Sequence, residues 1–203
     1  MEEQYDKFDL TMFDMVEYLP IIYISIQGLS GSGKTNLAYL FYEKYFPNFN
    51  LLHYESYFDS EKNLIFDNIL DEIKSTKRPY VIFDDLSFIV RVYQKEITYF
   101  LSELMRIRHS IKKGAFVFIS HYRKSVLPVL REAHIFCLTS LFQNQMEDYS
   151  KIFTYDSMYG FINKIKNLRE HYALVWLLGD IYTIKLPLSD MYLRKFGGDN
   201  KNG

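Results

Sequence analysis

The sequence has little of what marks secreted or membrane-spanning proteins. Its one cysteine, Cys137, excludes an intramolecular disulfide and fits a reducing compartment. No apolar run approaches the roughly 18 residues that a membrane-spanning helix needs. The first residues, MEEQYDKFD, are too acidic for a secretory signal or a transit peptide. We therefore expect an intracellular protein without a membrane span.

Net charge is also nearly absent. At −1 overall, the surface as a whole does not have the strong positive charge typical of nucleic-acid-binding proteins. The charge is uneven, however, because residues 1–19 are acidic and the segment 106–131 is rich in lysine and arginine. That basic segment is either an ordinary solvated face or a functional surface.

The chain is long enough for one α/β domain, with 203 residues that are 48% hydrophobic. It contains no internal repeat and no linker long enough to separate two domains. Apolar runs predict strands at 20–27, 50–54, 79–86, 115–120 and 134–140, and a β-hairpin around Gly179-Asp180. Helices are expected at 34–46, 61–75 (capped by Ser60), 94–110, 125–132, 143–152 and 158–169. This alternation predicts a mainly parallel sheet covered on both faces, with ligands at its carboxyl edge.

A glycine-rich segment joins the first predicted strand to the first predicted helix. Its spacing is G-x-x-x-x-G-K-T, the pattern of a phosphate-binding P-loop. Its glycines let backbone N–H groups approach phosphate oxygens, and the following helix adds its positive dipole end. Lys34 would reach the β- and γ-phosphates of a nucleoside triphosphate, and the Thr35 hydroxyl would ligate Mg²⁺. The alternative is a glycine-rich turn with a solvent-exposed lysine. The predicted nucleotide-binding residues are Gly28, Leu29, Ser30, Gly31, Ser32, Gly33, Lys34 and Thr35.

Around this motif the chain divides into three parts. We expect an acidic extension over 1–19, a P-loop ATPase domain of the RecA type over 20–190 and a disordered tail over 191–203.

Acidic residues follow two of the predicted strands. Asp84 and Asp85 end the run VIFDD, which has the form of a Walker B element. Asp84 would hold the Mg²⁺ shell, and Asp85 could orient the attacking water or accept its proton. Glu55, after the second strand, is a rival catalytic base. The alternative interpretations are an acidic turn for the pair and a solvent carboxylate for Glu55.

Two further kinds of residue are candidates for catalysis. His121 follows the strand AFVFIS and could contact the γ-phosphate or orient water, unless it is a plain loop histidine. Arg106 and Arg108 end the helix before that strand. An arginine there could act on a neighbouring subunit's nucleotide as an arginine finger, or could simply stabilise the helix C-terminus. The other histidines show no metal-ligand spacing.

Over residues 20–187 the chain resembles the FtsK–HerA group of P-loop ATPases. Within that group it is most similar to the genome-packaging ATPases of tailless, membrane-containing double-stranded DNA viruses, including archaeal viral forms. The resemblance rests on GLSGSGKT, on YVIFDD and on RIRHSIKKGAFVFISHYRKSVLPVLREAHIFCLTS. Two positions depart from the family pattern, since His121 replaces the usual glutamine sensor and Asp85 replaces the usual glutamate.

The resemblance implies an ATP- and Mg²⁺-dependent motor that assembles as a ring, expected to be a hexamer, and moves double-stranded DNA into a capsid. It implies contact with a capsid or inner-membrane protein, and a location in the host cytoplasm or with the virion. Lysine and arginine contacts to phosphates would make DNA binding independent of sequence and sensitive to salt. The candidates for these contacts are Lys112, Lys113, Arg123 and Lys124.

Two other functions stay open. SGSGKTNLA followed by LLHYESYF resembles the P-loop and substrate-side acid of small-molecule kinases of the uridine-kinase type, with Glu55 as the base. Against this, segment 106–131 has no obvious flexible lid. The second alternative is a nucleotide-dependent assembly switch that hydrolyses little, which the unusual Asp85 and His121 would suit.

Overall fold

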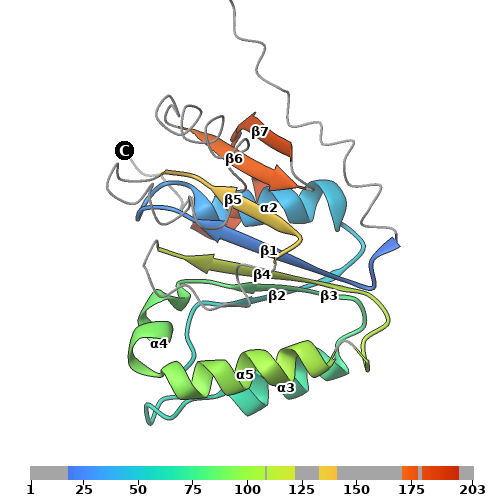
Figure 1. The fold of residues 1–203 in the computed structure, drawn as a ribbon, viewed down its shortest axis with the longest axis vertical. Coiled ribbons are helices and arrows are strands. Elements are labelled where there is room, and N and C mark those ends of the chain that lie inside the picture. Colours follow the sequence, from blue (N-terminus) through green and yellow to red (C-terminus); the bar gives the residue numbers. More distant parts are fainter. Residues whose placement is uncertain (1–17, 108, 122–132, 141–170, 178–179, 197–203) are drawn as a thin grey trace, which may run out of the picture.

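The computed structural model describes residues 18–107, 109–121, 133–140, 171–177 and 180–196, which form an α/β layer structure (Figure 1). These residues contain a seven-stranded sheet in the order β2-β3-β4-β1-β5-β6-β7. Strands β1 to β5 are parallel, while β6 and β7 add an antiparallel hairpin at one edge. The strands are β1 Ile21–Gln27, β2 Asn50–Tyr54, β3 Pro79–Phe83, β4 Gly114–Ser120, β5 Ile135–Leu138, β6 Tyr172–Leu177 and β7 Asp180–Lys185. The predicted mainly parallel sheet and terminal hairpin are confirmed.

Helices cover both faces of this sheet. Helix α2 (Lys34–Tyr45) lies on one face, and helices α3 (Phe66–Ser75) and α5 (Gln94–Ile107) lie on the other (Figure 1). Every residue of β1 is buried, because successive side chains of a strand point to opposite faces and both faces are covered here. Ile22 and Ile24 pack in the core on the α2 side, whereas Ile21 and Tyr23 pack with α3 and α5. The apolar runs of the strands are continuous because side chains on both faces of the sheet are buried.

The predicted helix over 61–75 is wrong in its first third. Only α3 is helical, and Ser60 does not cap it. The Asp59 carboxylate instead accepts the backbone N–H groups of Glu61 at 2.9 Å and Asn63 at 2.8 Å, and Lys62 takes a positive φ of 66°. Asp side chains compete with helices in this way by closing local turns.

Other boundaries differ in smaller ways. The predicted 94–110 helix ends at Ile107, and a seven-residue helix, α4 (Leu86–Val92), precedes it without having been expected. Helix α9 (Asp190–Phe196) occupies the start of the predicted disordered tail, so that part of the prediction is wrong. The predicted helices at 125–132, 143–152 and 158–169, and most of the acidic extension, lie outside the described residues. Across the described ranges, no helix combines the length and apolarity that crossing a bilayer requires.

Candidate functional site

The loop between β1 and α2 has the backbone of a ligand cradle. Gly31 and Gly33 have φ angles of 73° and 84°, which L side chains rarely adopt. Gly28 is required for a different reason, since a Cβ atom there would lie 2.1 Å from the Thr139 Oγ1 atom at the end of β5. The loop is also tied to that strand by the Leu29 backbone N–H, which donates to the Ser140 hydroxyl at 3.1 Å.

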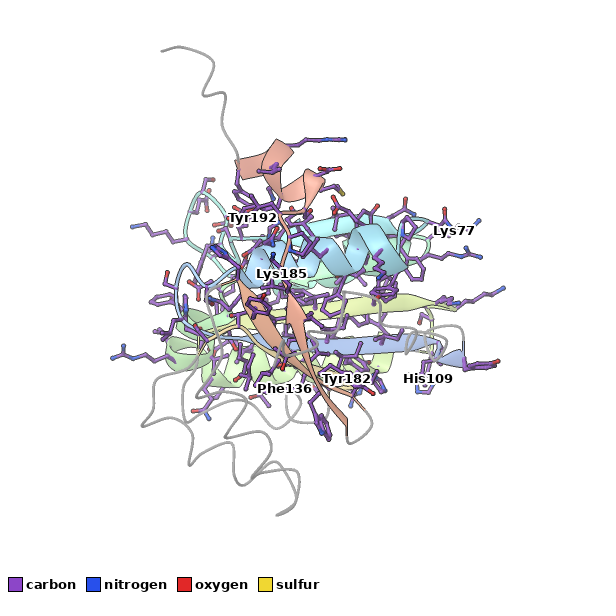
Figure 2. All side chains as sticks on the ribbon, turned by 90° about the horizontal axis from the view of Figure 1, so that it is seen from above. Lys77, His109, Phe136, Tyr182, Lys185 and Tyr192 are labelled. Carbon is purple, nitrogen blue, oxygen red and sulfur yellow. The ribbon has the colours of Figure 1, made fainter. Side chains whose placement is uncertain are left out.

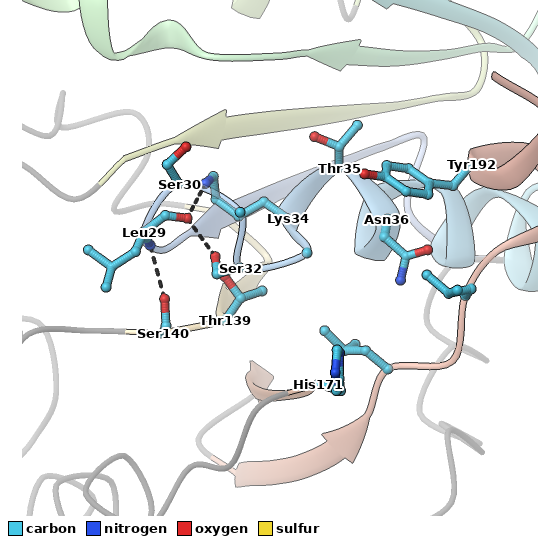
Figure 3. Close-up of a pocket in the computed structure, with 14 residues that line it drawn as sticks. Leu29, Ser30, Ser32, Lys34, Thr35, Asn36, Thr139, Ser140, His171 and Tyr192 are labelled. Carbon is cyan, nitrogen blue, oxygen red and sulfur yellow. Dashed lines mark hydrogen bonds between the residues drawn. The ribbon is translucent and has the colours of Figure 1, made fainter. Parts of the chain in front are cut away.

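A cavity of about 660 Å³ opens at this loop (Figure 3). Ligand pockets of a few hundred cubic ångströms hold molecules of nucleotide size. One wall is the loop and first turn of α2, and the opposite wall comes from the C-terminal part of the chain. The cavity is lined by residues 29–36 and by Thr139, Ser140, His171, Leu186, Leu188 and Tyr192.

Lys34 lies buried in the first turn of α2. Its ammonium donates to the Leu29 carbonyl at 2.7 Å and lies 3.4 Å from His121 Nδ1 (Figure 3 shows the first contact). Burial lowers the pKa of Lys34, and the nearby carboxylates of Asp84 and Asp85 only partly oppose this. The hydrogen bond to Leu29 places the Lys34 amino group at the cradle.

The P-loop and the end of β3 meet directly. The Thr35 hydroxyl donates to Asp84 Oδ2 at 2.8 Å, and the Tyr57 hydroxyl donates to the Asp84 backbone carbonyl at 2.8 Å. Burial acts to raise the pKa of Asp84, but His53, the Thr35 hydroxyl and the Asp85 N–H outweigh it and hold this pKa below its ordinary value. A hydroxyl and an ionised carboxylate in contact are oxygen donors of the kind that Mg²⁺ prefers, so the pair fits this ion.

Asp85 and His121 face each other across the end of the sheet. Asp85 takes a left-handed conformation, with φ of 46°, and its Oδ1 atom lies 3.7 Å from His121 Nε2. The His121 backbone N–H donates to the Ser87 hydroxyl at 2.7 Å, which fixes the end of β4 against α4. Strand β4 lies between β3 and β1, as predicted for a sensor strand. Sequence reasoning missed Ser87, whose only signal is its position two residues after the acidic pair.

Glu55 reaches the same region through a group of side chains. His53, in β2, lies 3.5 Å from the Glu55 carboxylate and 3.4 Å from Asp84 Oδ2. Lys195, from helix α9, donates to Glu55 at 2.6 Å. Sequence reasoning gave no role to His53 or Lys195. Both candidate bases thus lie near Asp84, and Glu55 is engaged in an ion pair.

The described lysine and arginine candidates for DNA contact and for the arginine finger lie away from the P-loop. Strand β4 runs from Gly114 toward the P-loop edge, so Lys112 and Lys113 before it lie at the opposite edge of the sheet. Figure 2 shows His109 and Lys77, which precede β4 and β3, at this same end of the molecule. Arg106 is exposed there and pairs with Glu103. Arg108, Arg123 and Lys124 lie outside the described residues.

Asn36 fastens the C-terminal segment to the P-loop helix. Its amide donates to the Pro187 carbonyl and accepts the Ser189 backbone N–H, both at 2.8 Å, and Asn36 and Ser189 are buried. Tyr192 of α9 lies beside α2 as a result (Figure 2). We call these two hydrogen bonds of Asn36 the clamp. They hold the C-terminal segment that forms the second wall of the cavity.

Asn36→Ala should lower the free energy of unfolding by about 1–3 kcal/mol, because it leaves the buried Ser189 N–H without its acceptor. Urea denaturation of the nucleotide-free protein measures the change. Asn68→Ala, on the exposed face of α3, is the matched control and should change stability little. Equal effects of the two substitutions would show that the clamp contributes nothing to stability.

Together, the parallel sheet, the glycine loop between β1 and α2 and the acid at the end of β3 define the fold of a P-loop NTPase. Among solved structures, the chain is similar to the genome packaging NTPase B204 from Sulfolobus turreted icosahedral virus 2. The complex of that protein with AMP gives a TM-score of 0.61 at 14% sequence identity, covering 84% of this chain and all of that one. Its complex with ATP-γ-S gives 0.60 at 15% identity over 82% and 98% of the two chains. The expected α/β fold of a P-loop NTPase, with its mainly parallel sheet, is thereby confirmed.

By sequence, no protein-family model and no curated protein matches the chain. At identities near 15%, the similarity to B204 establishes the fold alone.

Proposed function

We propose that this protein is a Mg²⁺-dependent ATPase that moves double-stranded DNA into a viral capsid. The observation that carries the proposal is the 2.8 Å contact between Thr35 and Asp84, with the Lys34 ammonium held at the same sheet edge. A structure with these groups in separate regions would have excluded a shared metal–triphosphate site.

Each group has a role that its position supports. The N–H groups of the loop and the Lys34 ammonium bind the phosphates and stabilise the charge that develops on the γ-phosphoryl group. Thr35 and Asp84 would hold Mg²⁺, and the bound ion would supply positive charge that offsets the charge of the phosphates. The Nδ1 atom of His121 lies 3.4 Å from Lys34 Nζ, and this contact supports a role for His121 as the sensor of the γ-phosphate.

Of the two candidate bases, the geometry favours Asp85. Both side chains are open to water, at 59% exposed for Asp85 and 50% for Glu55, but only Asp85 faces the sensor histidine. The Glu55 carboxylate is instead occupied by the Lys195 ammonium, which donates to it at 2.6 Å. In this proposal Asp85 orients or deprotonates the attacking water, while Glu55 forms an ion pair with Lys195 and takes no part in the chemistry.

DNA translocation rests on the B204 likeness and on the position of the basic residues. Lys112 is exposed at the edge of the sheet away from the nucleotide, where a second ligand could bind without competing for the cradle. Assembly into a ring, expected to be hexameric, would gather such residues from several copies around one channel. It would also let Arg106 or Arg108 act on a neighbouring subunit's nucleotide.

We expect duplex DNA to stimulate ATP hydrolysis, and phosphate release with and without DNA tests this. Replacing both Lys112 and Lys113 by glutamine should weaken DNA binding and reduce the salt slope of log K by about 2, because two phosphate contacts are lost. Lys95→Gln, an exposed cation in the first turn of α5 at the other end of the molecule, is the control.

Three outcomes separate the alternatives. Phosphorylation of a nucleoside without stimulation by DNA would favour the small-molecule kinase. Nucleotide binding without turnover would favour the assembly switch. Hydrolysis that duplex DNA leaves unchanged would retain the ATPase and reject the translocase.

A further inference from the structure

His53 lies where β2, β3, α2 and α9 converge, and its side chain is only 5% exposed. Its Nε2 atom lies 3.4 Å from Asp84 Oδ2, the carboxylate that contacts Thr35. Its Nδ1 atom faces the Tyr39 hydroxyl at 2.8 Å and the Lys195 ammonium at 2.7 Å. One buried ring thus joins the C-terminal helix to the acid at the end of β3.

The partners of this ring determine which nitrogen carries the proton. An ammonium has only donors, so the contact with Lys195 requires Nδ1 to accept. The remaining nitrogen, Nε2, must then carry the N–H, and this N–H is on the side of Asp84. The Tyr39 hydroxyl is compatible with this tautomer because it can also donate to Nδ1. The Glu55 carboxylate lies 3.5 Å from Nδ1, makes an ionic contact only, and accepts from Lys195 instead.

The Nε2 atom is buried and, among the described residues, has no hydrogen-bond partner of good geometry. The Asp84 carboxylate is close enough for an ionic contact but is not aligned for a full bond. A buried N–H without a partner costs free energy, and a hydrogen bond to the nearby Asp84 carboxylate would remove that cost. The Nε2–H of His53 therefore favours one orientation of the Asp84 carboxylate.

We propose that His53 is a positioning residue that orients Asp84 for its metal-holding role, and that Lys195 of α9 sets the required His53 tautomer. This inference rests on the proposed function, because it assigns a support to the predicted Mg²⁺ ligand. Groups that hydrogen-bond to a ligating carboxylate or histidine commonly control metal affinity in this way.

A purely structural role for His53 is the competing explanation. Its ring packs edge-on against Tyr39, with centroids 5.6 Å apart, and lies 6.4 Å from Phe196. Phenylalanine at position 53 would preserve this packing but lose the N–H, whereas glutamine would keep a donor near the position of Nε2. The two substitutions therefore separate packing from positioning.

The first test uses ¹⁵N imidazole spectra of the nucleotide-free protein, with the His53 signal assigned by its loss in His53→Gln. We expect the pattern of a ring protonated at Nε2. Lys195→Met should shift His53 toward a mixture of tautomers, whereas Arg194→Met, a neighbouring exposed residue of α9, should not. A ring protonated at Nδ1, or spectra unaffected by Lys195→Met, would overturn the role of Lys195.

The second test measures binding of a fluorescent ATP analogue as Mg²⁺ is titrated. His53→Phe should weaken the apparent Mg²⁺ affinity about 10–100-fold, as is typical when a supporting partner of a ligand is lost. His53→Gln should restore most of it, and binding in EDTA should be equal in all variants. Equal Mg²⁺ affinity in wild type and His53→Phe would reject positioning. If the affinity of the wild type for the ATP analogue did not depend on Mg²⁺, the proposed metal site itself would be rejected.

Discussion

Lys34→Met should reduce ATP hydrolysis on the order of 10²–10³-fold, the loss expected when one preorganised donor to developing negative charge is removed, about 2.7–4 kcal/mol. The Lys34 side chain is buried against the Leu29 carbonyl, so no solvent cation can take its place easily. The carboxylates of Asp84 and Asp85 would then lie near the phosphates without the positive charge of the lysine. Methionine keeps most of the stem and its packing.

Phosphate release and equilibrium binding of a fluorescent nucleotide together measure this effect. Lys44→Met is the control, because Lys44 is exposed in the last turn of the same helix. Near-normal hydrolysis by Lys34→Met would mean that the loop does not bind a reacting triphosphate.

Asp85→Asn should lower the hydrolysis rate about 10²–10⁴-fold, the usual contribution of a general base, while nucleotide affinity changes little. Asparagine is the right substitution because it tolerates the left-handed backbone that Asp85 adopts, whereas alanine would add strain. The carboxylate alone is removed, so the fold of the β3–α4 junction should persist.

Glu55→Gln is the matched comparison, since it also neutralises a carboxylate beside the site. We expect a much smaller decrease, because Glu55 is paired with Lys195. Single-turnover rates at saturating ATP decide between the two acids. A large loss in Glu55→Gln with normal turnover in Asp85→Asn would assign the base to Glu55.

The parts of the fold that could be predicted are those that depend on nearby residues. The apolar runs gave the strands because two-sided burial leaves a continuous hydrophobic signature, as in β1 and β4. The P-loop was predictable because its glycines act on their own backbone, as the positive φ angles of Gly31 and Gly33 confirm. Helix α4 was missed because its seven residues are too few for a clear helical period.

The parts that could not be predicted depend on residues far apart in sequence. His53 and Lys195 are separated by 142 positions, and neither stands in a recognisable motif. Lys195 was placed in the disordered tail because GGDN follows closely, although the preceding residues form α9. The P-loop neighbourhood of Asp84 was predictable from the topology of parallel sheets, but its buried support by His53 was not.

The clamp between Asn36 and Ser189 spans 153 positions, so the cavity acquires its second wall only from the last described part of the chain. Because synthesis proceeds from the N-terminus, the ribosome releases the glycine loop long before Leu186, Leu188 and Tyr192 exist to enclose it. A nascent chain would therefore display an open phosphate cradle, and the complete pocket would form only after the residues up to Tyr192 had left the ribosome.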